Sequence, residues 1–212
     1  MFQGNNISLK DNDGKLNVTY QDNFISEGDE ILQLLNNDII YNSAEESKIK
    51  IFGKEIEIPR RQVAYGETGT SYKFSGTTVV AKNWNDDNEL CKFILKVKNK
   101  ISQEFDFDPN FVLINRYDNG DQYIGFHSDD EKDLVSDSPI VGVTFGHSRE
   151  LIFKNNKTNK KKSIVTKHGS IYSINYPTNK YYKHSIPKTK HVNTFRISFT
   201  FRKMKLWSHK QK

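Results

Sequence analysis

The stretch Phe195-Arg196-Ile197-Ser198-Phe199-Thr200-Phe201-Arg202, near the end of the chain, alternates apolar and polar residues without a break. Such alternation predicts a half-buried β-strand. Successive side chains of a strand point to opposite faces, so Arg196, Ser198, Thr200 and Arg202 share one face. At about 3.3 Å per residue the two arginine backbones lie roughly 20 Å apart. Guanidinium groups bind carboxylates with paired hydrogen bonds, so we expect a small dicarboxylic acid between these long side chains.

The remaining apolar runs predict short strands and two helices. One helix is expected from Ser26 to about Asn36, and a second over 88–102 has an apolar stripe of Leu90, Phe93, Ile94 and Val97. This arrangement has no βαβ alternation and favours an α+β, mainly β fold, a jelly-roll (double-stranded β-helix) core with supporting helices. The expected strands other than 195–202 cover 49–52, 55–58, 62–65, 111–117, 140–145, 151–154, 163–166 and 170–175.

Composition sets the broad class of protein. Charged residues make up 27% of the chain and aromatic residues 12%, which is typical of a globular protein. No run of 18 apolar residues exists, and residues 1–6 lack the pattern of a signal peptide, so we expect no membrane association. The single Cys91 favours a reducing, intracellular compartment. The net charge of +6 suits a polyanionic partner without establishing one.

Two histidines and an aspartate form a candidate metal site. His127 and Asp129 are two residues apart, so an extended backbone aims both side chains the same way. His184 is the third ligand that we choose, since two histidines and one carboxylate form the facial triad of non-haem ferrous oxygenases. The alternative is a surface histidine beside the acidic cluster of residues 129–131. A triad beside a dicarboxylate site indicates 2-oxoglutarate chemistry.

A second strand, 111–117, ends with polar side chains on its apolar face. Phe111, Leu113, Asn115 and Tyr117 share that face, and Asn115 and Tyr117 are able to hydrogen-bond a carboxylate. The alternative is a strand whose end simply becomes polar.

Short motifs that point to one family follow one another from about residue 49 to 204. They are Ile51-Phe52-Gly53-Lys54, Pro59-Arg60-Arg61-Gln62, Tyr65-Gly66, Tyr72-Lys73-Phe74-Ser75-Gly76, Ile114-Asn115-Arg116-Tyr117, His127-Ser128-Asp129-Asp130-Glu131, Ser138-Pro139-Ile140, Phe145-Gly146, His168-Gly169-Ser170, His184-Ser185-Ile186-Pro187 and the stretch from Arg196 to Arg202. Each motif alone is weak, but the ordered set is specific. It resembles the AlkB family of Fe(II)- and 2-oxoglutarate-dependent nucleic-acid dioxygenases, and most closely its branch that repairs double-stranded DNA.

The resemblance implies roles for individual residues. His127, Asp129 and His184 would hold iron at the catalytic centre. Arg196 would pair with the carboxylate of 2-oxoglutarate that lies far from the metal. The residues that would otherwise bind 2-oxoglutarate are Asn115, Tyr117, Ser198 and Arg202. The residues that would bind the substrate are Phe52 as a wedge in the duplex, Tyr72 and Phe74 beside an extruded base, Asp130 and Glu131 near a cationic base, and the basic residues Arg60, Lys188 and Lys190.

The sequence departs from the family pattern at two positions, and the resemblance also implies how the chain is divided into domains. Ser198 stands where this branch usually has Asn, and Tyr182 where it usually has Trp. Residues 1–48 would be an N-terminal extension, and 206–212 a basic tail. The dioxygenase domain would cover 49–205, with a substrate-recognition part at 49–85 and the jelly roll at 108–205.

The implied function is oxidative demethylation of 1-methyladenine and 3-methylcytosine in DNA, expected to be double-stranded, with release of formaldehyde, succinate and CO2. The alternatives are the same chemistry on RNA or single-stranded DNA, a basic nucleic-acid-binding module without catalysis, and a metal-dependent hydrolase, which the paired arginines disfavour. We expect a monomer, nuclear if the source is eukaryotic, and find no clamp-binding peptide in the sequence. The Asn- and Lys-rich composition would fit a viral source.

Overall fold

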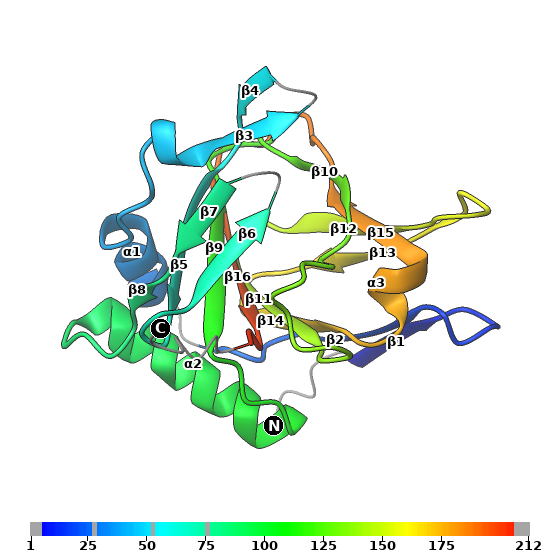
Figure 1. Cartoon of the computed structure of the whole chain (residues 1–212), viewed down its shortest axis with the longest axis horizontal. Coiled ribbons are helices and arrows are strands. Elements are labelled where there is room, and N and C mark those ends of the chain that lie inside the picture. The colour runs from blue at the N-terminus through cyan, green and yellow to red at the C-terminus, as the bar shows by residue number, and fades with distance from the viewer. Residues whose placement is uncertain (1–5, 27–28, 52–53, 75–76, 206–212) are drawn as a thin grey trace, which may run out of the picture.

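Two β-sheets face one another in the computed structural model, which describes residues 6–26, 29–51, 54–74 and 77–205 (Figure 1). The large sheet runs β1 (Asn6–Lys10), β2 (Asn17–Gln21), β14 (Ser170–Ile174), β11 (Ile140–Gly146), β16 (Arg196–Arg202), β9 (Phe111–Tyr117), β5 (Arg61–Gly66) and β8 (Lys82–Asn83). The small sheet runs β10 (Ile124–His127), β15 (Tyr182–Ile186), β12 (Arg149–Asn155) and β13 (Lys161–Thr166). The predicted jelly-roll sandwich with supporting helices is therefore confirmed.

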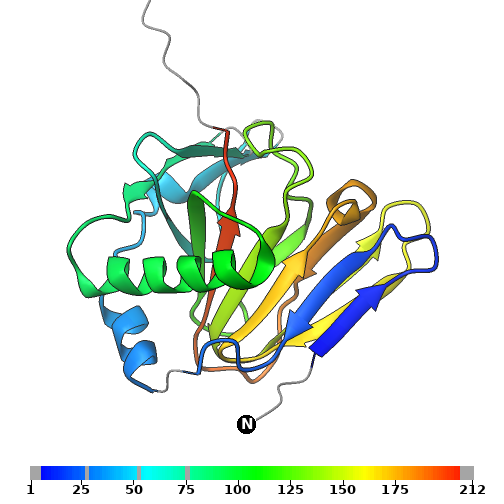
Figure 2. The same ribbon diagram turned by 90° about the horizontal axis from the view of Figure 1, so that it is seen from below.

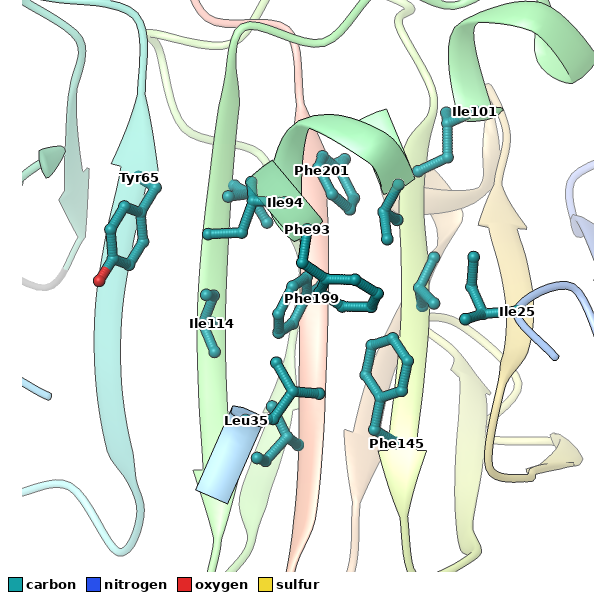
Figure 3. Close-up of a cluster of buried hydrophobic side chains, with 14 of the residues drawn as sticks. Ile25, Leu35, Tyr65, Phe93, Ile94, Ile101, Ile114, Phe145, Phe199 and Phe201 are labelled. Carbon is teal, nitrogen blue, oxygen red and sulfur yellow. The ribbon is translucent and has the colours of Figure 1, made fainter. Parts of the chain in front are cut away.

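The strand predicted from the arginine-bearing stretch is β16, which lies between β11 and β9 in the large sheet. Phe199 and Phe201 are fully buried on the face that the helices cover (Figure 3), and Ile197 is buried in the same cluster. The opposite, polar face is buried as well, because it points into the space between the two sheets. The prediction of a half-buried strand was therefore wrong about exposure, although the alternation of the two faces is correct.

The outer face of the large sheet is covered by α1 (Asp29–Asn37) and α2 (Glu89–Phe105) (Figure 2). The side chain of Asn88 caps α2 by accepting a hydrogen bond from the backbone N–H of Cys91 at 2.8 Å. The ring of Phe93 packs edge-on against Phe145 and Phe199, with ring centroids 5.7 and 6.2 Å apart. The predicted apolar stripe is thus buried against the sheet. Cys91 is buried and has a packing role.

Residues 6–21, for which the sequence analysis predicts no strand, form β1 and β2 and extend the large sheet beyond β14. Val18 and Tyr20 of β2 are buried in the core between the sheets. The side-chain hydroxyl of Tyr182 in β15 donates to Asp11 in the β1–β2 turn at 2.9 Å. This N-terminal hairpin is therefore built into the sandwich.

Smaller elements frame one end of the sandwich. Two further hairpins are present: β3 (Lys48–Ile51) with β4 (Lys54–Glu57) lies at the top of Figure 1, and β6 (Ser71–Phe74) with β7 (Thr77–Val80) contacts β5. A 3-10 turn, η1 (Glu45–Ser47), precedes β3, and the one-turn helix α3 (Thr178–Tyr181) leads into β15. In the part of the chain that the structure describes, no helix has the length and apolar character needed to cross a membrane.

Candidate active site

Three side chains from the small sheet converge on one point. His127 ends β10, Asp129 follows it by two residues, and His184 is the central residue of β15. Their potential ligand atoms all lie within 4.8 Å of one another. The Nε2 atoms of His127 and His184 lie 3.9 and 3.5 Å from the two carboxylate oxygens of Asp129. β10 and β15 are neighbours in the sheet, so residues 57 positions apart in sequence are brought side by side.

The surroundings of both imidazoles favour the neutral form that binds a metal. Nδ1 of His127 lies 2.9 Å from the backbone carbonyl of Gly125, and a proton on Nδ1 leaves Nε2 free as a ligand. Burial lowers the pKa of His127, and burial together with the nearby His127 lowers the pKa of His184 to about 3. Neutral imidazoles and a carboxylate are the donor set that a ferrous ion takes in a facial triad.

The carboxylate of Asp129 is held in its charged form. Burial would raise its pKa, but the positive charge of Arg202 is the largest opposing influence, and the pKa of Asp129 lies below its ordinary value. Nη2 of Arg202 donates to Oδ1 of Asp129 at 2.8 Å, and both side chains are buried. A charged carboxylate with its second oxygen toward His184 is therefore available as a metal ligand.

A cavity of about 700 Å3 opens from the triad between the two sheets. The predicted residues that line it together are Arg60, Tyr72, Asn115, Tyr117, His127, Asp129, Asp130, Glu131, His184, Arg196, Ser198 and Arg202. The register of β16 and β9 explains why side chains of the large sheet line the cavity together. Arg196 pairs with Tyr117 and Ser198 with Asn115 across β16 and β9, so all four side chains point to the same face.

Two buried arginines beside this cavity, Arg196 and Arg202, have donor atoms without hydrogen-bond partners. Nε and Nη1 of Arg196 are buried without a hydrogen-bond partner, and so are the same two atoms of Arg202. Arg196 donates one hydrogen bond, from Nη2 to the hydroxyl of Thr166 at 3.3 Å. Buried guanidinium atoms without partners are costly, so they indicate a ligand with carboxylate groups. The cavity therefore fits 2-oxoglutarate, a dicarboxylic acid.

Other polar side chains that line the cavity are paired with one another. The hydroxyl of Tyr72 donates to Oε1 of Glu131 at 2.5 Å, and the guanidinium of Arg202 lies over the Tyr72 ring, 4.5 Å from its centroid. Nε of Arg60 donates to Oδ1 of Asn115 at 3.0 Å. Burial raises the pKa of Glu131, against the influence of Arg202. The Tyr72 ring and the Glu131 carboxyl group therefore lie side by side, and together they are able to bind a flat, positively charged group.

The other predicted residues do not line the cavity or fall outside the description. Lys188 and Lys190 are exposed in the loop after β15, and Nζ of Lys188 lies 5.3 Å from the ring centroid of Tyr123, a lining residue. Phe52 lies outside the described residues. Phe74 belongs to β6, but its side chain is not described.

Sequence reasoning missed one buried charge near the site, Arg149, which is only 2% exposed at the start of β12. Arg149, Leu151 and Phe153 alternate along β12 and are all buried. A charged residue on an otherwise apolar strand face was the signal that identifies it.

The sequence model of the 2OG-Fe(II) oxygenase superfamily matches residues 17–202, which include β2 and every cavity residue named above. The chain belongs to this superfamily. The predicted class of enzyme, a dioxygenase, is confirmed, and so are the two predicted cofactors, Fe(II) and 2-oxoglutarate. The residues that line the cavity fit both cofactors.

Relatives of this oxygenase confirm the resemblance to the AlkB family. It is 36% identical to the DNA oxidative demethylase ALKBH2 of Bos taurus over 84% of this chain and 65% of the bovine protein. It is 36% identical to the Homo sapiens protein of the same name, over 85% of this chain and 70% of the human protein. The solved structure of OsALKBH1 superposes on 94% of this chain and on 100% of its own length, with a TM-score of 0.58 and 14% sequence identity. This match shows a similar fold.

Proposed function

We propose that this oxygenase repairs alkylated DNA by oxidative demethylation. One observation carries the proposal: the His127, Asp129 and His184 triad and the Tyr72–Glu131 pair border the same cavity. The similarity to proteins named DNA oxidative demethylase ALKBH2 supports DNA as the substrate. When bound, Fe(II) and 2-oxoglutarate supply the oxidation by O2 of a methyl group, which leaves as formaldehyde beside succinate and CO2.

The triad is assigned to the metal and the large-sheet residues to 2-oxoglutarate. Arg202 orients Asp129 and lies at the metal end of the cavity. Arg196 and Tyr117 lie at the other end of the paired strands and are assigned to the distal carboxylate. Between them, Asn115 and Ser198 are directly opposite one another and offer hydrogen bonds to the same ligand. Two guanidinium groups at the ends of one polar floor suit a molecule with a carboxylate at each end.

The base to be repaired is assigned to the part of the cavity beside Tyr72 and Glu131. A base inside a duplex is out of reach and must be extruded, at a cost of a few kcal/mol that a methyl group on its pairing edge reduces. Tyr72 offers a ring for stacking, with Phe74 as a second ring by assignment from the sequence. 1-Methyladenine and 3-methylcytosine carry positive charge, which suits the carboxylates of Glu131 and Asp130 and disfavours unmodified bases. Arg60 is assigned to this pocket as well, and it donates a hydrogen bond to Asn115 of the 2-oxoglutarate floor.

The remaining assignments concern the nucleic acid around the base. Lys188 and Lys190 are exposed beside the cavity and are assigned to backbone phosphates, which give affinity and salt dependence rather than sequence specificity. Phe52 is assigned as the wedge that fills the space left by the extruded base, which makes duplex DNA the preferred substrate. We propose that the protein acts as a monomer and that, in a eukaryotic cell, it works in the nucleus.

The test is formaldehyde release from matched duplex and single-stranded oligonucleotides that carry one 1-methyladenine. We expect release that requires both Fe(II) and 2-oxoglutarate, is greater on the duplex, and is absent in His127→Ala. Phe52→Ala should reduce release from the duplex much more than from the single strand. Greater release from single-stranded DNA or RNA would reassign the substrate. DNA binding without 2-oxoglutarate turnover would favour the non-catalytic alternative.

A further inference from the structure

Arg149 is a buried cation that the proposed chemistry does not use. It begins β12 and is 2% exposed, yet no carboxylate among the described residues lies within ion-pair distance of it. Its Nε is buried without a hydrogen-bond partner. A buried charge that lacks a counter-ion costs folding free energy, so its position calls for a compensating role.

The guanidinium of Arg149 ties together two loops that border the cavity. Nη1 donates to the backbone carbonyl of Asn119 at 3.2 Å, and Nη2 donates to the carbonyls of Gln122, at 3.0 Å, and Pro187. Asn119 and Gln122 belong to the loop that leads from β9 into β10, and Pro187 directly follows β15. β10 and β15 carry His127 and His184. One side chain therefore sets the spacing of the segments on both sides of the cavity.

Arg149 also lies against Tyr117, one of the two residues assigned to the distal carboxylate. The Tyr117 ring lies 5.8 Å from the guanidinium carbon of Arg149 and 5.6 Å from that of Arg196. The hydroxyl of Thr166 links the two arginines, because it donates to the backbone carbonyl of Arg149 at 2.9 Å and accepts from Arg196. Tyr117 and Arg196 line the cavity, whereas Arg149 is one layer further out.

The electrostatics of this cluster favour an incoming anion. Burial and the charge of Arg196 both lower the pKa of Arg149, although an arginine stays protonated at neutral pH. Carbonyl groups and an aromatic ring surround the charge but do not neutralise it. The guanidinium groups of Arg149 and Arg196 both lie near the ring of Tyr117 and repel each other, and a carboxylate bound beside them would reduce that repulsion.

We propose that Arg149 is a positioning residue for the distal end of the 2-oxoglutarate site: it holds Tyr117 and the two loops in place, and its charge makes the cavity prefer a dicarboxylic acid to a monocarboxylic one. This inference rests on the proposed assignment of 2-oxoglutarate to the cavity. It adds a residue that does not touch the ligand and that the spacing of the sequence motifs does not reveal.

The test compares two ligands by calorimetry on Mn(II)-loaded protein without oxygen, so that no turnover occurs. 2-Oxoglutarate and 2-oxovalerate share the keto-acid end and the chain length, but only the former has a distal carboxylate. We expect Arg149→Met to weaken 2-oxoglutarate binding by about tenfold and to change 2-oxovalerate binding much less. Arg149→Lys, which keeps the charge but loses the fork of donors, should retain more of the preference.

The matched control is Arg116→Met. Arg116 is also buried and also lies against an aromatic ring, that of Phe195, but its side chain bonds Asp118 and Asn36 and does not line the cavity. This variant should lose stability and keep both the ligand preference and the Mn(II) affinity of the wild type.

Two results would overturn the inference in distinguishable ways. A wild-type protein that does not prefer the diacid would remove the 2-oxoglutarate assignment and the inference with it. A wild type that prefers the diacid, beside an Arg149→Met protein with the same preference, would limit Arg149 to a role in stability. Should Arg149→Met fail to fold, Arg149→Gln decides, because it also removes the charge but keeps a donor for the loop carbonyls: a preference lowered by about threefold supports the inference, and an unchanged preference overturns it.

Discussion

The guanidinium of Arg202 donates to Oδ1 of Asp129 at 2.8 Å, both side chains are buried, and the guanidinium also lies against the ring of Tyr72. These residues are 73 positions apart in sequence, one at the end of β16 and the other after β10. The pair joins the two sheets at the metal end of the cavity. A candidate metal ligand from the small sheet is thereby oriented by a candidate 2-oxoglutarate residue from the large one.

Replacing Arg202 should damage both stability and metal binding. Arg202→Met leaves the carboxylate of Asp129 buried beside two neutral histidines without its cation, so we expect a loss of about 3–5 kcal/mol in the free energy of unfolding of the metal-free protein. Urea unfolding checks this value, and Mn(II) titration checks the ligand. Arg61→Met, at a partly exposed ion pair, is the control and should cost about 1 kcal/mol or less. Equal losses in the two variants would contradict the role of the buried pair.

Removing His184 should abolish specific metal binding and leave the fold intact. His184→Ala takes one of three converging ligands from the site, and we expect Mn(II) affinity to fall by about 100-fold or more. Electron paramagnetic resonance of Mn(II) measures the free ion directly. His168→Ala is the matched control, since that imidazole accepts a hydrogen bond from the backbone of Gly146 outside the cavity. Unchanged affinity in His184→Ala would remove it from the triad.

Tyr72→Phe separates base binding from cofactor binding. The change removes the hydroxyl that donates to Glu131 and keeps the ring, so we expect kcat/KM on 1-methyladenine DNA to fall by about tenfold. Binding of 2-oxoglutarate should stay the same, and calorimetry measures it. Tyr182→Phe is the control, because its hydroxyl pairs with Asp11 outside the cavity. An equal loss of activity in the control would mean that the hydroxyl of Tyr72 has no specific part in the pocket.

The carboxylate of Asp118 should make the free energy of unfolding depend on pH. Burial would raise its pKa, but hydrogen bonds and charges from Arg61 and Arg116 outweigh that effect and lower it. A carboxylate with a lowered folded-state pKa stabilises the protein above its ordinary pKa of about 3.9, and the stabilisation is lost as the pH falls through and below that value.

Asp118→Asn should therefore cost about 1–3 kcal/mol of unfolding free energy at pH 7. The difference from wild type should shrink at pH 3 and below, and urea unfolding at both pH values measures it. Asp13→Asn removes an exposed carboxylate and should cost about 0.5 kcal/mol or less. A difference for Asp118→Asn that does not change with pH would show that the loss comes from packing rather than charge.

The strands and helices with a clear apolar period were predictable from the sequence. Alternation located β16, an apolar run ending in a turn signal located β9, and the stripe of Leu90, Phe93, Ile94 and Val97 located α2. The N-terminal hairpin was missed. β1 is an exposed edge strand whose side chains carry little burial pattern, and β2 is only five residues long. Such strands are stabilised by neighbours that are distant in the chain, here β14.

The sequence by itself determined the set of side chains on each strand face, and the ordered motifs determined the family. Only the tertiary structure decided which of those faces meet. Pairing of β10 with β15 brought His127 to His184, and the facing of two sheets set Arg202 on Asp129. It also placed Arg149 behind Tyr117, which no local pattern encodes. The physical reason is that periodicity acts over a few residues, whereas hydrogen bonds between loops and charges between sheets depend on how the whole chain packs.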